Sequence, residues 1–145
     1  MDRLILLRHG KAEADSASGD DFDRRLAPRG VRESADMGAQ LADMGFKPDV
    51  VLVSTAARTR DTWQSAAAAF PGAEARFDDQ LYHADSGSIR RAAEAAGATC
   101  GTVMVVGHNP GMQELTIRLL MEGSAPSSLL AKARRRPRCV TSPQI

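Results

Sequence analysis

The chain has 145 residues, 43% of them hydrophobic and 26% charged, a composition typical of a globular protein that can bury one core. Its net charge is +1, but five basic residues follow residue 130, and subtracting those five leaves the first 130 residues at −4. Such an acidic body excludes the broad basic face of a nucleic-acid-binding domain, and no apolar run approaches the roughly 20 residues that a membrane helix needs.

These features predict one domain over residues 1–130 and a basic, disordered tail over residues 131–145. The chain opens without a charged and apolar leader, so we expect a cytoplasmic protein. Cys100 and Cys139 lack the spacing of metal ligands and are too few for a disulfide framework. Both are therefore expected to be free thiols.

The first predicted strand is the continuous apolar run Leu4–Leu7, which leads directly into Arg8, His9 and Gly10. Four apolar residues without alternation are typical of a strand covered on both faces, as in a parallel sheet between two layers of helices. Ligands of such sheets bind beyond the carboxyl ends of the strands, so Arg8 and His9 are predicted to meet a ligand. Gly10 is expected to let the backbone turn sharply close to it.

A polar loop over residues 11–25 and a helix over residues 28–44 are expected next. Pro28 suits the first turn of a helix and Gly45 its end, although Ala27 offers no side-chain cap. The predicted apolar stripe of this helix consists of Val31, Ala35, Gly38, Leu41, Ala42 and Met44.

A second continuous apolar run predicts a strand over residues 49–53 that ends in Ser54 and Thr55. The helix predicted over residues 56–70 carries Arg58 in its first turn. An edge strand over residues 73–77, an acidic loop over residues 78–85 and a helix over residues 86–96 complete this part of the chain.

The third continuous apolar run is Val103–Val106, and it is followed by His108 and Asn109. Asn109 is expected to cap a helix that Pro110 opens, with a buried face formed by Met112, Leu115, Leu119 and Leu120. The alternation of strands and helices predicts an α/β fold, a three-layer α/β/α sandwich with a mostly parallel central sheet. The polar residues after its three buried strands would then meet at one edge.

The two histidines and the two arginines, Arg8 and Arg58, favour a site for a phosphoryl group. The planar guanidinium matches phosphate oxygens bidentately, and the amino end of the helix after Asn109 adds partial positive charge. A neutral histidine can attack phosphorus and form a covalent phosphoenzyme that water hydrolyses. Neighbouring arginines would lower the pKa of that histidine and keep it neutral near pH 7.

A metal site is the alternative, with His9 and His108 joined by carboxylates from the acidic loop residues Asp20, Asp21 and Asp23. Neither histidine belongs to a short-range ligand pair, and two arginines in the same pocket would repel a cation. We therefore expect no metal and no other cofactor.

The ordered set of motifs resembles the histidine phosphatase superfamily, which has a phosphoglycerate mutase-like fold, and within it the small bacterial phosphohistidine phosphatases. The resemblance extends from residue 3 to about residue 122. The matching stretches are Arg8–Glu13, Asp23-Arg24 with Leu26 and Pro28–Gly30, Ser54 with Ala57–Arg60, Leu81-Tyr82, and Val106–Gly111.

The resemblance implies that His9 is the phosphorylated nucleophile and that Arg8, Arg58 and His108 bind and polarise the phosphoryl group. Members of the family that act on small phosphate esters commonly carry an acid where this chain has His83, and that acid protonates the leaving alkoxide. Further candidates for substrate binding are Lys11, Arg24, His83 and Asn109.

A phosphorylated imidazole leaves without a strong acid, because its leaving nitrogen can be protonated in the ground state. His83 in place of a carboxyl donor thus favours phosphohistidine on a protein, such as a phosphorelay component, although Asp78 or Asp79 could still supply an acid. Only 49 residues separate Arg58 from His108, which leaves no room for a capping insertion. A phosphatase for small phosphate esters and a non-catalytic phosphate-binding module are the alternatives.

The end of the chain departs from the family pattern. Relatives follow the helix after His108 with a turn and another apolar strand, whereas here a similar turn over residues 126–131 leads into an arginine-rich segment. We therefore expect the final strand to be missing or incomplete, which would leave one edge of the sheet unpaired.

Overall fold

The computed structural model describes residues 1–123 and 139–143. Its strands are β1 (Arg3–Arg8), β2 (Val50–Ser54), β3 (Glu74–Asp78), β4 (Thr102–Gly107) and β5 (Cys139–Pro143). Its α-helices are α1 (Pro28–Asp43), α2 (Ala57–Ala66), α3 (Ser86–Gly97) and α4 (Gly111–Glu122). Three short 3₁₀ helices complete the described elements: η1 (Asp21–Asp23), η2 (Ala67–Ala69) and η3 (Asp79–Leu81).

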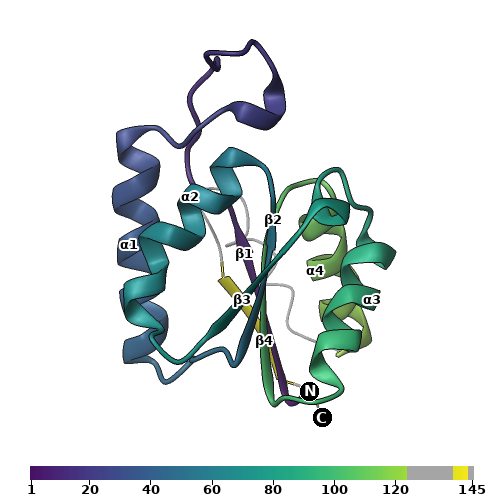
Figure 1. Cartoon of the computed structure of the whole chain (residues 1–145). Helices are drawn as coiled ribbons and strands as arrows, with labels where there is room; N and C mark the ends of the chain where they lie inside the picture. The colour runs from purple at the N-terminus through teal and green to yellow at the C-terminus, as the bar shows by residue number, and fades with distance from the viewer. Residues whose placement is uncertain (124–138, 144–145) are drawn as a thin grey trace.

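The five strands form one sheet in the order β3-β2-β4-β1-β5 (Figure 1). The pairs β1–β4, β2–β4 and β2–β3 are parallel, which confirms the predicted mostly parallel sheet and the position of β3 near its edge. The central strand β4 has β1 on one side and β2 on the other. The three continuous apolar runs of the sequence are therefore neighbours in the sheet.

Helices cover both faces of the sheet, with α1 and α2 on one face and α3 and α4 on the other (Figure 1). Alternate residues of each strand point to opposite layers: Leu4 and Leu6 pack in one hydrophobic cluster, Ile5 and Leu7 in the other. This arrangement confirms the predicted three-layer fold and explains why the strands carry unbroken apolar runs.

The strand β5 corrects the expectation of a missing or incomplete final strand. Residues 139–143 pair antiparallel with β1 and cover the outer edge of that strand. The sequence Cys-Val-Thr-Ser-Pro lacks a continuous apolar run, so the pattern used for the other strands did not find it. β5 lies inside the predicted tail, whose other residues, 131–138 and 144–145, are outside the described part of the chain.

The buried face of α1 agrees with the predicted stripe only at Gly38 and Leu41. The residues that the fold buries are Gly30, Ser34, Gly38 and Leu41, whereas Val31 and Met44 are 43% and 59% exposed. A Cβ added to Gly38 would lie within 3.0 Å of Ala66 in α2. The two helices thus approach so closely that small residues, and not the largest apolar ones, form their contact.

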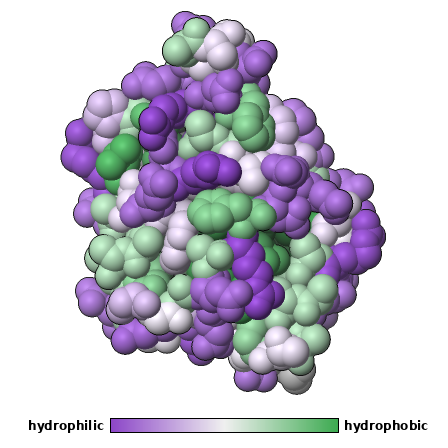
Figure 2. All heavy atoms as spheres, viewed as in Figure 1, coloured by the Kyte–Doolittle hydropathy of each residue, from purple (hydrophilic) through white to green (hydrophobic). Residues whose placement is uncertain are grey.

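Other local predictions are confirmed or shifted by a residue or two, except that the helix predicted over residues 56–70 ends at Ala66 and continues as the 3₁₀ helix η2. Ala27 makes no side-chain cap to α1, and Cys100 is a half-buried free thiol. In the described part of the chain, the helices are too short or too polar for any of them to cross a membrane. Hydrophobic and hydrophilic residues are mixed on the face shown in Figure 2, and Phe77 of the edge strand β3 is 48% exposed.

Candidate active site

The register of the sheet brings the ends of three strands together. Arg8 pairs with Gly107, so the next residues, His9 and His108, leave neighbouring strands side by side. Val53 pairs with Val106 on the other side of β4, which places Ser54 beside the same strand end. The predicted meeting of polar residues at the carboxyl edge is therefore what the fold produces.

His9 is held in one orientation by the backbone that follows it. Its Nδ1 lies 2.8 Å from the carbonyl oxygen of Gly10, which can only accept, so Nδ1 carries the proton and Nε2 keeps its lone pair. The pKa of His9 is lowered to about 4, mainly by burial, which the hydrogen bond to the Gly10 carbonyl opposes and the charges of Arg58, Arg8 and Arg24 reinforce. His9 is thus a neutral imidazole with a free Nε2 at pH 7.

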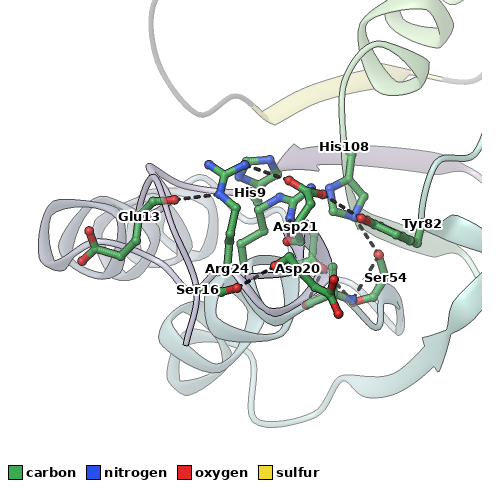
Figure 3. A network of polar contacts seen from close by, with 12 residues as sticks. His9, Glu13, Ser16, Asp20, Asp21, Arg24, Ser54, Tyr82 and His108 are labelled. Atoms are coloured by element: carbon green, nitrogen blue, oxygen red, sulfur yellow. Dashed lines mark hydrogen bonds and ion pairs between the residues drawn. The ribbon is translucent and has the colours of Figure 1, made fainter. Parts of the chain in front are cut away.

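His108 faces His9 with a distance of 5.4 Å between the ring centroids. Its Nε2 makes a 2.7 Å hydrogen bond with the hydroxyl of Ser54, which is fully buried at the end of β2 (Figure 3). Burial, followed by the charge of Arg58, lowers the pKa of His108 to about 3. Its Nδ1 is buried and has no hydrogen-bond partner among the described residues.

Arg58 stands in the first turn of α2, directly after β2, and its side chain is only 8% exposed. Its two terminal nitrogens donate to Asp21, one to the backbone oxygen at 2.8 Å and one to Oδ2 at 3.0 Å. The Nε–H of the guanidinium and the second hydrogen of each terminal nitrogen are not used in these bonds, and these donors can still bind an anion.

Asp21 is the centre of a polar network beside the two histidines (Figure 3). Its Oδ2 accepts from the hydroxyl of Tyr82 at 2.7 Å as well as from Arg58, and its Oδ1 accepts from Arg24 at 2.8 Å. Hydrogen bonds from Tyr82, Arg24 and Arg58 hold the pKa of this carboxyl well below its ordinary range. Asp21 is therefore ionised, although its side chain is 46% exposed.

The loop that carries Asp21, residues 11–27, is closed at its base. The backbone amide of Glu13 donates to Arg25 and that of Ala27 donates to Lys11, while Ala12 and Leu26 form an isolated antiparallel bridge. The carboxylate of Asp61 in α2 then accepts from the Arg25 side chain and from the Leu26 amide. The base of the loop is thus fixed on the helix that also carries Arg58.

The remaining predicted cations lie around this network at different depths. The Arg8 and Lys11 side chains are exposed, and Arg8 lies close enough to His9 to lower the pKa of its imidazole. Arg24 is tied to the loop, since its Nε donates to the backbone oxygen of Glu13 at 2.8 Å. The fold brings Arg8 and Arg24 to the site, whereas Lys11 contributes mainly its backbone, which accepts from Ala27.

The segment after β3 forms the opposite wall. The ring of Tyr82 packs edge-on against His108 with a centroid distance of 5.5 Å and lies 3.9 Å from the ring of His83. His83 is exposed and has a φ of 59°, a left-handed conformation uncommon for its type. Its charge lowers the pKa of His108, which places it near the site.

Asp78 and Asp79 are both engaged in local structure. Asp78 caps η3 by accepting from the amide of Gln80 at 2.9 Å. Asp79 accepts from the hydroxyl of Thr55 at 2.6 Å and so ties η3 to the end of β2. Neither carboxylate is bonded to His9, His108 or Arg58.

The prediction that Asn109 caps the last helix is wrong. The side chain of Asn109 makes no cap, because α4 begins one residue later than expected, at Gly111, with Pro110 as its N-cap residue. Gly10 does not have a positive φ, and a Cβ there would lie 2.8 Å from the Gly30 carbonyl oxygen and 2.9 Å from Ser34 Oγ. The close packing of α1 therefore requires glycine at position 10.

The acidic loop residues do not assemble around the histidines as a metal site would require. Asp21 is bonded to two arginines, and Asp23 accepts from Ser18 at 2.6 Å. Among the residues that the structure describes, no three histidine, cysteine or acidic side chains converge as metal ligands.

Three members of the site were not among the predicted site residues: Ser54, Tyr82 and Asp21. Ser54 could have been found by the rule that located His9 and His108, because it too ends a buried strand. Tyr82 belongs to a stretch that matches the family, but the sequence predicts no role for it. The sequence offers Asp21 only as a candidate metal ligand, and nothing in it indicates a pairing with Arg58.

Comparisons with known proteins agree with this geometry. A model of the histidine phosphatase superfamily (branch 1) matches residues 4–99. An uncharacterised protein of Mycobacterium tuberculosis is 36% identical over 113 residues, which cover 78% of this chain and 69% of that protein. A related protein of Mycobacterium leprae is 32% identical over 121 residues, covering 81% and 73%.

Solved structures with similar folds include two SixA proteins. A protein of Agrobacterium tumefaciens assigned as the phosphohistidine phosphatase SixA has a TM-score of 0.86 and 33% identity, covering 97% of this chain and 90% of that chain. The protein histidine phosphatase SixA complexed with tungstate has a TM-score of 0.69 and 25% identity, covering 81% and 76%. A phosphoglycerate mutase of Plasmodium falciparum, at 19% identity and a TM-score of 0.62, shares the fold.

Proposed function

Because the chain belongs to the histidine phosphatase superfamily and is a SixA-like phosphatase, we propose that it hydrolyses phosphohistidine on a protein through a phosphoenzyme formed on His9. The observation that carries the nucleophile is the hydrogen bond from His9 Nδ1 to the Gly10 carbonyl. It leaves the Nε2 lone pair of a neutral imidazole free to attack phosphorus.

Arg58, Arg8 and His108 are the proposed ligands of the phosphoryl oxygens, since His108 faces His9 at 5.4 Å and the charges of Arg58 and Arg8 act on the His9 imidazole. Guanidinium groups stabilise the negative charge that spreads over the equatorial oxygens during transfer. A phosphoryl oxygen beside His108 would also supply a partner to its buried Nδ1. The tungstate complex of SixA supports an anion site in this family. We propose that no metal ion takes part.

Phosphohistidine is favoured over small phosphate esters by the groups that line the mouth of the site. The position where ester phosphatases of the family carry an acid holds His83, and Asp78 and Asp79 are bonded to Gln80 and Thr55. An alkoxide needs an acid in order to leave, whereas an imidazole does not. The residues between α2 and β4 are occupied by η2, β3, η3 and α3, so no inserted cap encloses the mouth there.

The test is to measure hydrolysis of a phosphohistidine peptide and of a sugar phosphate by the full chain, each with and without a chelator. We expect the peptide to be the better substrate, a chelator to have no effect, and an acid-labile phosphoenzyme to accumulate when the reaction is quenched. A preference for the sugar phosphate would favour an ester phosphatase. Loss of activity with chelator would overturn the metal-free mechanism, and absence of any phosphoenzyme would favour a binding module.

A further inference from the structure

Asp21 occupies an unexpected place for an acidic residue, because an ionised carboxylate next to a phosphoryl site repels the substrate's own charge. The network nevertheless holds it there with three donors, Arg58, Arg24 and Tyr82. A negative charge that the fold fixes in this position influences which substrates the site binds.

The hydrogen bonds of the carboxylate leave one direction open. Oδ2 accepts from both Arg58 and Tyr82, whereas Oδ1 accepts only from Arg24 among the described residues. Each carboxylate oxygen can accept about two hydrogen bonds, so Oδ1 can take one more donor. The side chain is 46% exposed, and a ligand entering the mouth can reach it.

The surroundings of the carboxylate suit a flat ring. Tyr82, whose hydroxyl donates to Oδ2, lies beside Asp21 and edge-on against His108 (Figure 3). His83 and Phe22 pack on Tyr82 with centroid distances of 3.9 Å and 5.0 Å. An aromatic wall next to a carboxylate can stack a ring and accept a hydrogen bond from its edge. Alkyl and sugar leaving groups match neither feature as well.

We propose, on the basis of the proposed function, that Asp21 selects phosphoramidate substrates by accepting a hydrogen bond from the N–H of the phosphorylated imidazole, on the ring nitrogen that does not carry phosphorus. The ionised carboxylate stabilises the protonated, cationic form of that ring. Asp21 is therefore a residue that determines specificity at the leaving-group side of the site.

The transfer step balances without an added acid. His9 Nε2 forms a bond to phosphorus while the bond from phosphorus to the substrate nitrogen breaks, and the electron pair of the broken bond stays on that nitrogen. Because the other ring nitrogen already carries a proton, the ring leaves as neutral imidazole. Asp21 neither gives nor takes a proton, which agrees with a carboxyl that three hydrogen bonds keep ionised.

An acidic side chain in this place would instead disfavour phosphate esters. Its charge repels the approaching phosphate, an ester offers no ring N–H in return, and an ionised carboxylate cannot protonate an alkoxide. An ionised Asp21 thus favours cationic leaving groups and cannot itself act as the acid that ester hydrolysis requires.

The experiment compares Asp21→Asn with the wild-type chain on two substrates, a phosphohistidine peptide and p-nitrophenyl phosphate, whose phenolate leaves without protonation. The matched control is Asp23→Asn, since Asp23 lies in the same 3₁₀ turn but its carboxylate accepts only from Ser18 among the described residues. Thermal melts of the three chains check the fold, which a half-exposed side chain on a loop should not disturb.

We expect Asp21→Asn to lower kcat/KM for the peptide by about tenfold, mainly through KM, because the ring charge is greatest before the bond breaks. Activity on p-nitrophenyl phosphate should fall clearly less than activity on the peptide, because the variant weakens the bond between Arg58 and Asp21 for both substrates but removes the ring contact only for the peptide. Asp23→Asn should leave both substrates unchanged. Equal losses on both substrates would reduce Asp21 to a support for Arg58 and overturn the inference, as would no loss on the peptide. A wild-type chain active on p-nitrophenyl phosphate but not on the peptide would overturn the proposed function itself.

Discussion

The candidate active site has a floor and a rim that are built differently. The floor consists of His9, Ser54, Arg58 and His108, which follow or end adjacent parallel strands, and Ser54, Arg58 and His108 are almost fully buried. The rim consists of Asp21, Arg24, Tyr82 and His83, which stand on two loops and are partly or largely exposed. Figure 1 shows the first of these loops projecting beyond the sheet, and Figure 2 shows it as mostly hydrophilic.

The difference indicates a division of labour. Groups on strand ends are held by the ladder and by the core beneath it, which suits chemistry that depends on distances of a few tenths of an ångström. Groups on loops can vary without disturbing the core, which suits the choice of a substrate. Substitutions in the floor should therefore affect every substrate, and substitutions in the rim should affect some substrates more than others.

The largest expected effect is that of His9→Ala. Loss of the nucleophile should reduce turnover by on the order of 10³-fold or more on every substrate, because the arginines cannot replace covalent catalysis. The measurement is steady-state hydrolysis together with trapping of radiolabelled phosphate on the protein. Retention of more than about a tenth of the wild-type rate, or label found on His108, would show that the nucleophile is misassigned.

Arg58→Lys should lower the activity on the order of 10²-fold, because lysine keeps the charge but lacks the planar guanidinium that can bond to Asp21 and to a phosphoryl group at once. The loss should be similar for peptide and ester substrates if Arg58 acts on the phosphoryl group. Arg60→Lys is the matched control, because Arg60 lies on the same helix but stacks over Phe77. Near-normal kinetics of Arg58→Lys would remove this residue from the floor.

The acid limb of the pH profile should lie near pH 4, because burial lowers the pKa of His9 to about 4 and only the neutral imidazole can attack. Below that pH we expect kcat/KM to fall by about tenfold per pH unit. A limb near 6.5, the ordinary value for histidine, would mean that His9 is solvated in the free enzyme.

The lowered pKa values of His9 and His108 also predict how the stability of the fold depends on pH. His9 and His108 bind protons in the unfolded chain near pH 6.5 but in the folded chain only near pH 4 and pH 3. Between these values the unfolded state holds more protons, so the free energy of unfolding should decrease as the pH falls below about 6.5. The slope is at most about 1.4 kcal/mol per pH unit for each histidine, and urea unfolding of wild type and His9→Ala measures it.

The smallest effect is expected for His83→Ala. An exposed rim histidine should change hydrolysis of a phosphohistidine peptide by less than about threefold, because imidazole leaves without its help. If His83 serves as the acid for esters, the variant should lose much more activity on an alkyl phosphate than on the peptide. Equal losses above about tenfold on both substrates would mean instead that His83 holds the phosphoryl group and belongs to the floor.

The residues of the floor could be predicted from the sequence because each of them stands close to the apolar run that identifies its strand. Each buried strand is visible as a continuous apolar run, and parallel strands between helices must end at a common edge. His9 and His108 stand two residues after such runs and Arg58 stands in the first turn of the helix after a third run, so their convergence required no knowledge of the packing. Ser54 obeys the same rule and could have been included.

The rim and the last strand were decided by tertiary structure. Asp21 meets Arg58 only because Asp61 fastens the base of the 11–27 loop to α2, a contact between residues 35 positions apart. The short side chains on the buried face of α1 reflect its close approach to α2, and β5 is recognisable only by its pairing with β1. An apolar run records burial within its own residues, whereas a loop carboxylate or a polar edge strand acquires its place from partners distant in the chain.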